Sequence, residues 1–236
     1  MSLRGGGCSR APYASFNLAL HVGDNPRDVI ENRRRLRTQL ALPSEPLWLS
    51  QVHGTHVVDA DSSVCPPLPQ ADGAVTRRPG RVLAVLVADC LPVLFARQDG
   101  SAVAIAHAGW RGLAAGVLEA TVAALGGAGE TLQAWLGPAI GPDHFEVGEE
   151  VRHALGLQDT QADSAFRRNA RGRWQCDLHA LTRRRLAGLG VRSVHGERRC
   201  SYAQQQSFYS YRRDGVTGRM AALIWLNRAQ ARTPRP

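Results

Sequence analysis

The longest apolar stretch of the chain, residues 82–96, sets the tightest limit on its fold. It contains Asp89, Cys90 and Pro92, and it is shorter than the roughly 20 residues that a membrane-spanning helix needs. Short apolar runs bounded by polar residues are typical of buried β-strands. The stretch therefore predicts two buried strands on either side of a polar break, at residues 82–87 and 92–96.

Capping residues and apolar spacing predict the other elements. Asn25 followed by Pro26 is typical of a helix start, and this helix should end before Pro43. Apolar residues from Leu113 onward recur at helical spacing and predict a helix that ends at Gly126. Further helices are predicted over residues 147–155 and 177–189. Further strands are predicted over residues 47–52, 55–60, 102–106, 132–136, 191–195 and 220–226, with a tight turn at His53 and Gly54 between the first two.

The elements interleave without a strict strand–helix alternation, which predicts an α+β (mixed α/β) fold in layers. No linker-like composition divides the 236 residues into two domains. We expect a flexible N-terminus over residues 1–12, a single domain over 13–227 and a polar C-terminal tail over 228–236. The basic start of the chain is not followed by an apolar segment, so we expect no secretory signal and a cytoplasmic protein.

The chain is strongly basic, with a net charge of +9, and all 29 of its basic residues are arginine. These arginines form short clusters spread along the chain, and no zinc-finger, RNP or helix-turn-helix motif accompanies them. The pattern favours solvated surfaces and disfavours nucleic acid as a partner.

Three residues with metal-binding side chains lie where apolar segments end: His53, Cys90 and His107. Imidazole and thiolate are zinc ligands, and three protein ligands leave an open position, as in catalytic zinc sites. Two other interpretations use the same residues. The histidines are ordinary turn residues and the cysteine a small buried apolar residue, or Cys90 is a nucleophile with His107 as its base. The residues alone leave all three open.

Four sequence strings occur in an order that resembles the YfiH family, also called the laccase-domain or polyphenol-oxidase family. They are SQVHG at 50–54, ADGAVT at 71–76, ADCLPV at 88–93 and AHAGWRG at 106–112, and the similarity extends to FYSYRRDGVTGRMAALIWL at 208–226. The resemblance implies a single-domain α/β/β/α sandwich and a metal, usually zinc, held by His53, Cys90 and His107. It also implies a purine nucleoside phosphorylase that acts on adenosine, inosine and methylthioadenosine with phosphate, and that has adenosine deaminase side activity.

Two alternatives to this activity stay open. The family was earlier described as copper-dependent polyphenol oxidases, which leaves copper as the alternative metal, although the chain has only two methionines and no H-x-H pair. A Cys-His hydrolase acting on an amide or a cell-wall precursor is the other alternative.

The implied reactions point to further site residues. Deamination needs a carboxylate that moves protons, for which Asp72 and the catalytic candidate Asp89 are available. If the backbone stays extended, however, Asp89 points to the face opposite Cys90. Phosphorolysis needs arginines that bind phosphate; Arg111 fits best, and Arg33 and Arg212 or Arg213 are weaker candidates. The aromatic residues available for stacking a purine are Trp110, Phe208 and Tyr209.

Overall fold

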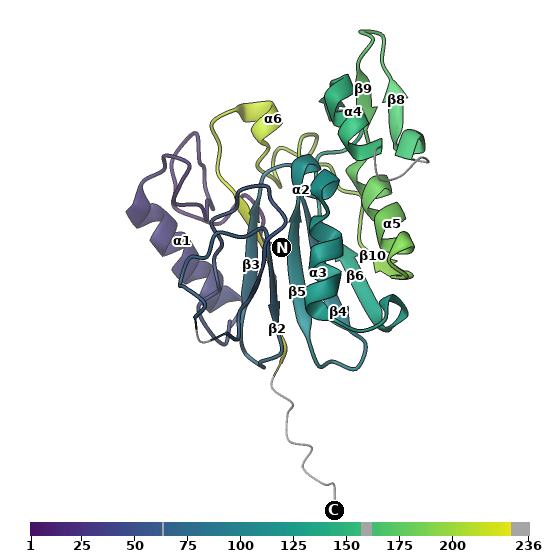
Figure 1. Cartoon of the computed structure of the whole chain (residues 1–236). Coiled ribbons are helices and arrows are strands. Elements are labelled where there is room, and N and C mark those ends of the chain that lie inside the picture. Colours follow the sequence, from purple (N-terminus) through teal and green to yellow (C-terminus); the bar gives the residue numbers. More distant parts are fainter. Residues whose placement is uncertain (63, 157–161, 228–236) are drawn as a thin grey trace, which may run out of the picture.

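The computed structural model describes residues 1–62, 64–156 and 162–227. Within them, the largest sheet has the strand order β1-β2-β5-β4-β6-β10 (Figure 1). The pairs β1–β2 and β6–β10 are parallel, and the other neighbours are antiparallel. Its strands are β1 (Val57–Asp59), β2 (Gly73–Thr76), β4 (Leu91–Arg97), β5 (Val103–Ala108), β6 (Leu132–Leu136) and β10 (Ser193–His195).

Two smaller sheets accompany the large one. The first pairs β3 (Leu83–Val87) with β11 (Met220–Ile224) in antiparallel fashion. The second contains β7 (Glu146–Val147), β9 (Trp174–Cys176) and β8 (Phe166–Arg168), and its β8–β9 hairpin projects from the body of the molecule (Figure 1).

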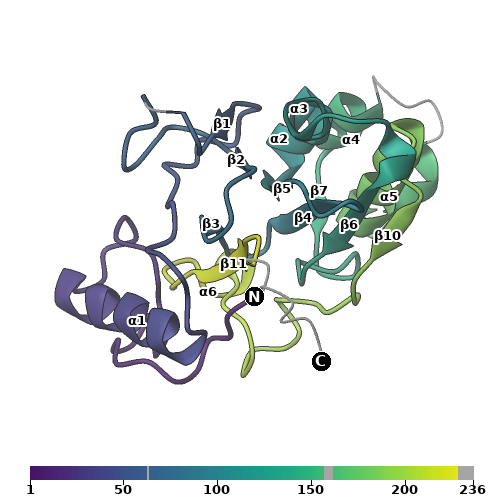
Figure 2. The same cartoon turned by 90° about the horizontal axis from the view of Figure 1, so that it is seen from below.

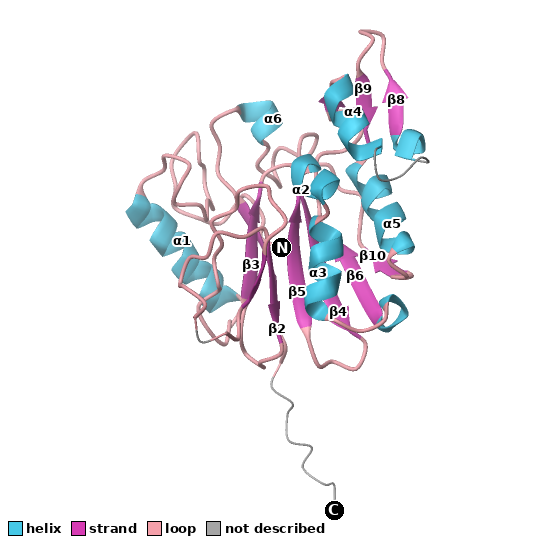
Figure 3. Ribbon diagram, viewed as in Figure 1, coloured by secondary structure: helices cyan, strands magenta, loops and turns pink. Residues whose placement is uncertain are grey.

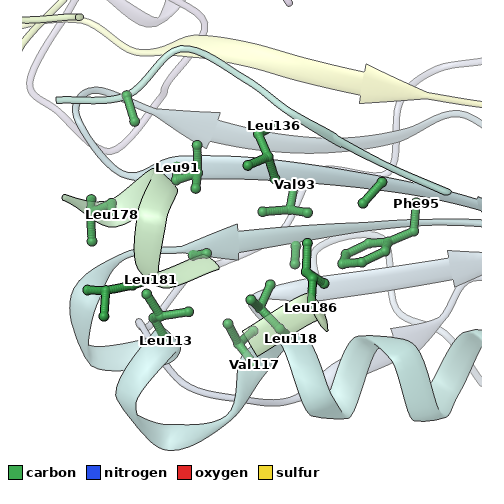
Figure 4. Packing of buried hydrophobic residues seen from close by; sticks show 14 of the residues in the cluster. Leu91, Val93, Phe95, Leu113, Val117, Leu118, Leu136, Leu178, Leu181 and Leu186 are labelled. Carbon is green, nitrogen blue, oxygen red and sulfur yellow. The ribbon is translucent and has the colours of Figure 1, made fainter. Parts of the chain in front are cut away.

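Both faces of the large sheet are buried, because alternate residues of its strands enter different cores. On β4, Leu91, Val93 and Phe95 pack into one core, whereas Leu94 and Ala96 contact a second core on the other face. Helices cover the first core, to which they contribute residues such as Leu113 and Leu186 (Figure 4). These helices are α2 (Trp110–Ala115), α3 (Val117–Leu125), α4 (Glu149–Gly156) and α5 (Leu178–Gly188).

The β3–β11 pair lies against the opposite face of the large sheet. Leu83, Val85 and Val87 of β3 enter the second core, while Ala84 and Leu86 enter a third core. Helix α1 (Pro26–Gln39) covers this third core with Leu36. The resulting order, with helices, large sheet, β3–β11 and α1 in succession, confirms the predicted α/β/β/α sandwich (Figure 2).

Most predicted elements are present. Helix α1 begins at Pro26, and the side chain of Asn25 accepts a hydrogen bond from the N–H of Arg27, as expected of an N-cap. The strands expected in the apolar stretch are β3 and β4. The helix expected from Leu113 to Gly126 is instead two helices, because Gly116 adopts a left-handed conformation with φ of 101° and breaks it.

The hairpin predicted around His53 and Gly54 is wrong. Residues 40–56 are mainly loop (Figure 3), in which Leu47 and Ser50 make only isolated bridges, to Leu83 and Gln70. The strand that follows the turn, β1, pairs in parallel with β2. The physical reason is that the buried carboxylate of Asp72 accepts hydrogen bonds from the backbone N–H groups of the turn.

Residues 1–12, which we expect to be flexible, make hydrogen bonds with the body of the molecule. The N–H of Ser2 donates to the carbonyl of Ala221 at 2.8 Å, and the N–H of Cys8 donates to Oδ1 of Asn32 at 2.9 Å. The polar tail predicted over 228–236 lies outside the described residues. No helix in the described part of the chain is long and apolar enough to cross a membrane.

Candidate functional site

The strand register brings three polar residues to one edge of the large sheet. Leu91 at the start of β4 pairs with Ala108, and Gly73 at the start of β2 pairs with Ala106, so both strands begin beside the end of β5. Asp72 and Cys90 directly precede β2 and β4, and His107 lies on β5 between the two paired positions. The edge that carries them adjoins α2 and α6 (Tyr211–Asp214), at the top of Figure 1.

Asp72 is completely buried and organises this edge through its carboxylate. Its Oδ1 lies 2.8 Å from Nδ1 of His107 and accepts the N–H of His53 at 3.0 Å, while its Oδ2 accepts the N–H groups of Val52 and Gly54. These bonds curl the backbone around the carboxylate and hold His53 at a left-handed φ of 60°. They also engage Nδ1 of His107, which leaves its Nε2 as the nitrogen available to a ligand.

His53, Cys90 and His107 converge as the sequence suggested. Each offers one ligand atom, and these atoms all lie within 4.8 Å of one another. The Cys90 Sγ is 4.0 Å from the His53 Nε2. Gly109 packs against the group so closely that an added Cβ would lie 2.8 Å from the Cys90 Sγ, which is closer than van der Waals contact allows. The structure therefore brings together the donor set of a three-ligand metal site.

The electrostatics of these side chains favour a charged pair. Burial would raise the pKa of the Cys90 thiol, but the neighbouring His107 and His53 outweigh it and lower the pKa to about 6. Burial would lower the pKa of His107, but Cys90 and Asp72 outweigh it and raise the pKa to about 9. A cysteine that readily loses its proton is prepared either for metal binding or for nucleophilic attack.

A cavity of about 600 Å³ opens beside this group. The three sequence-predicted residues Trp110, Arg111 and Arg212 line it together with Asp89. The residues that sequence reasoning missed are His21, Gln51, Tyr211 and Arg219, which also line it. His21, Tyr211 and Arg219 lie far from the candidate ligands in sequence, whereas Gln51 lies two residues before His53. The available signals were the quoted strings, because Gln51 falls within 50–54, and Tyr211 and Arg219 fall within 208–226.

The remaining candidates lie elsewhere. Arg33 lies on α1, where its Nε donates to the carbonyl of Leu18 and its guanidinium stacks 3.9 Å from the centre of a Trp48 ring. Arg213 donates to the carbonyls of Ser201, Tyr202 and Phe208 and so holds the backbone. Phe208 and Tyr209 are fully buried in the core between the sheets. Arg33 and these aromatic residues are not among the described residues that line the cavity, and local sequence does not show on which layer a residue lies.

Arg219 is the most enclosed arginine of the cavity lining. Its Nη1 donates to the carbonyls of Thr217 and Gly218, and its guanidinium lies 5.7 Å from the centre of the Tyr211 ring. Among the described residues it has no carboxylate within ion-pair distance, and burial lowers its pKa. A half-buried guanidinium without a carboxylate partner is suited to an anionic ligand.

Comparisons with known proteins find relatives that match nearly the whole chain. The family model described as multi-copper polyphenol oxidoreductase laccase matches residues 1–227. A protein of Escherichia coli (strain K12) named purine nucleoside phosphorylase YfiH is 50% identical over 225 residues, which are 95% of this chain and 92% of that protein. A purine nucleoside phosphorylase of Pseudomonas aeruginosa is 51% identical over 227 residues, with 96% and 92% covered. The crystal structure of a Neisseria meningitidis protein of family DUF152 matches with a TM-score of 0.91 and 46% identity, covering 96% of this chain and 92% of that chain.

Proposed function

Since the chain belongs to the family described as multi-copper polyphenol oxidoreductase laccase, whose relatives above are named purine nucleoside phosphorylases, we propose that it is a metal-dependent purine nucleoside phosphorylase. Membership also confirms the resemblance noted in the sequence. The proposed substrates are adenosine, inosine and methylthioadenosine together with phosphate, and deamination of adenosine is the proposed side activity. The observation that carries the proposal is a His-Cys-His donor set beside a cavity with three arginines.

The donor set fits zinc. Two imidazoles and one thiolate are common zinc ligands, and the hydrogen bond that the His107 Nδ1–H donates to Asp72 is the kind of support that metal-binding histidines usually have. A zinc ion held by His53, Cys90 and His107 would supply Lewis-acid activation of the substrate or of water.

A copper oxidase is less well supported. Copper also binds such ligands tightly, but a blue-copper site adds a weak axial ligand, usually Met or Gln. No methionine is among the residues that line the cavity. The Gln51 amide oxygen accepts the N–H of Leu86 and is thereby engaged.

Residues that line the cavity are assigned to phosphate and to the purine. Phosphate is bound by Arg111, Arg212 and Arg219, whose guanidinium groups offer paired N–H donors to its oxygens. The purine stacks on Trp110 or Tyr211 at the wall of the cavity. In phosphorolysis a phosphate oxygen forms the bond to the sugar C1′ as the bond to the purine nitrogen breaks. The arginines place phosphate for this attack and balance its charge.

One observation favours a second function. The Asp72 carboxylate, His107 imidazole and Cys90 thiol lie in the order of a Cys-His-Asp triad, as in cysteine hydrolases. Such a hydrolase would act on an amide or cell-wall precursor without a metal. His53 has no place in this triad, whereas it completes a metal site.

The test is to identify the products when purified, zinc-loaded protein is incubated with adenosine, with and without phosphate. Adenine and ribose 1-phosphate that form only with phosphate would support phosphorolysis, and inosine formed without phosphate would support deamination. Intact adenosine in both reactions would overturn the proposal. Chelation separates the two functions, because it should stop a metal enzyme, whereas a metal-free hydrolase would be stopped only by alkylation of Cys90.

A further inference from the structure

Asp89 occupies an unusual position between β3 and Cys90. Its φ is 97°, in the left-handed region that residues other than glycine rarely adopt, so the backbone does not stay extended as the sequence argument assumed. Its carboxylate faces the C-terminal part of the chain. Oδ1 accepts the Ser201 hydroxyl at 2.6 Å, and Oδ2 accepts the backbone N–H of Arg212 at 2.7 Å.

The backbone of Asp89 makes a third connection. Its carbonyl accepts the N–H of Ile140 at 2.9 Å. Ile140, Arg212 and Asp89 itself all line the cavity. One residue, next to the thiol of Cys90, therefore ties together three segments that are far apart in sequence and surround the same cavity.

The segment held by Asp89 carries two cavity residues, Tyr211 and Arg212. The Arg212 guanidinium donates to the carbonyl of Glu146 and lies 5.2 Å from the centre of the Phe145 ring. Arg212 is thus anchored twice, with its backbone N–H on Asp89 and its guanidinium on the carbonyl of Glu146. One of these two anchors lies on the loop that also carries Cys90.

A carboxylate that moves protons during a reaction must have an oxygen within reach of the substrate. Each oxygen of Asp89 already accepts a hydrogen bond from the protein. We infer that Asp89 is a positioning residue: its carboxylate fixes α6 to the Cys90 loop, and so aims Arg212 at an anionic substrate group. The identity of that group as phosphate rests on the proposed function.

Two variants separate positioning from proton transfer. Asp89→Asn keeps both hydrogen bonds, because the amide oxygen can accept the Arg212 N–H and the amide nitrogen can donate to the Ser201 hydroxyl, and asparagine tolerates a left-handed φ. Asp89→Gly also tolerates that φ but removes both bonds. Positioning predicts that KM for phosphate rises about tenfold in Asp89→Gly with a smaller fall in kcat, and about threefold or less in Asp89→Asn. Loss of a proton-transfer group predicts that both variants lose about 10²-fold or more in kcat.

Hydrogen exchange provides a readout that does not depend on activity. In Asp89→Gly, amide exchange in peptides covering residues 209–214 should rise on the order of tenfold, whereas Asp89→Asn should exchange like the parent protein. Ser201→Ala, which removes one of the two bonds, should have an intermediate effect and replaces Asp89→Gly if that variant does not fold. Asp99→Asn, in the turn at the opposite end of β4, is the control for loss of a carboxylate.

Two results would overturn the inference: unchanged exchange and KM in Asp89→Gly, or a kcat in Asp89→Asn as low as in Asp89→Gly. If the parent protein does not cleave adenosine with phosphate, the proposed function fails. The exchange measurement still decides whether Asp89 fixes α6.

Discussion

The two ends of strands β4 and β5 differ in which residues adopt a left-handed backbone conformation. At the β4–β5 turn, the left-handed position is taken by Gly100, with a φ of 71°, and Asp99 accepts the N–H and hydroxyl of Ser101. At the other end, the left-handed positions are taken by His53 and Asp89, with φ values of 60° and 97°. Glycine adopts this conformation without steric cost, whereas histidine and aspartate do not. The comparison indicates that the end with Gly100, the turn end, is built without backbone strain. At the end with His53, Asp89 and Cys90, the site end, the backbone is strained in order to place side chains with chemical functions.

The largest effect is expected from Asp72→Ala, which removes the carboxylate that the site end depends on. The variant leaves the N–H groups of Val52, His53 and Gly54 and the His107 ring without their partner. Removing one member of a buried charged pair costs about 3–5 kcal/mol. We expect a loss of stability of this size in urea denaturation, with loss of bound zinc. A variant that unfolded at the same urea concentration as the parent protein and kept its zinc would show that the site end does not depend on Asp72.

Cys90→Ala should abolish metal binding and activity while leaving the fold intact. Cys90 is a ligand candidate on the loop, not a residue of the three apolar cores. We expect zinc content to fall from one equivalent to a trace, measured by atomic emission, and turnover of adenosine to fall with it. Cys65→Ala, which changes a thiol in a loop outside the cavity lining, is the matched control and should keep both. Full zinc in folded Cys90→Ala protein would remove Cys90 from the ligand set.

Sequence located the candidate ligands better than the residues that hold them in place. His53, Cys90 and His107 could be found because each follows or ends an apolar segment, and the local pattern also gave β3, β4 and β5. The role of Asp72 could not be found in this way, because it depends on β2 lying beside β5.

The same limit applies to the arginines. Sequence gives the charge of Arg33 and Arg219 equally, but only the packing of layers places one on α1 and the other at the cavity. Interactions between residues far apart in the chain have no local pattern that would reveal them. For this reason the hairpin expected at His53 was wrong although each of its residues was suitable for a turn.

Gly109→Ala is expected to weaken metal binding without unfolding the chain. The added methyl group would lie 2.8 Å from the Cys90 Sγ and 3.2 Å from the His53 Cδ2, so both ligands must move. Displaced support around a metal site typically costs about 10–100-fold in affinity, which competition with a zinc chelator can measure. Gly188→Ala, where an added Cβ has no neighbour within 4 Å, is the control and should bind zinc as the parent does. Equal affinities in the two variants would mean that the close packing at Gly109 does not position the ligands.

The smallest effect is expected from a pair of arginine variants that separates the cavity from the surface of α1. Arg219→Met keeps much of the packing of the side chain but removes a guanidinium that has no carboxylate partner among the described residues, so KM for phosphate should rise about tenfold with little change in zinc content. Arg33→Met removes a guanidinium that already stacks on Trp48 and donates to Leu18, and it should change stability slightly and KM not at all. Phosphate-dependent initial rates with adenosine measure both. If the two variants raised KM equally, the anion site would extend beyond the cavity, and the division between a site end and the rest of the fold would have to be redrawn to include α1.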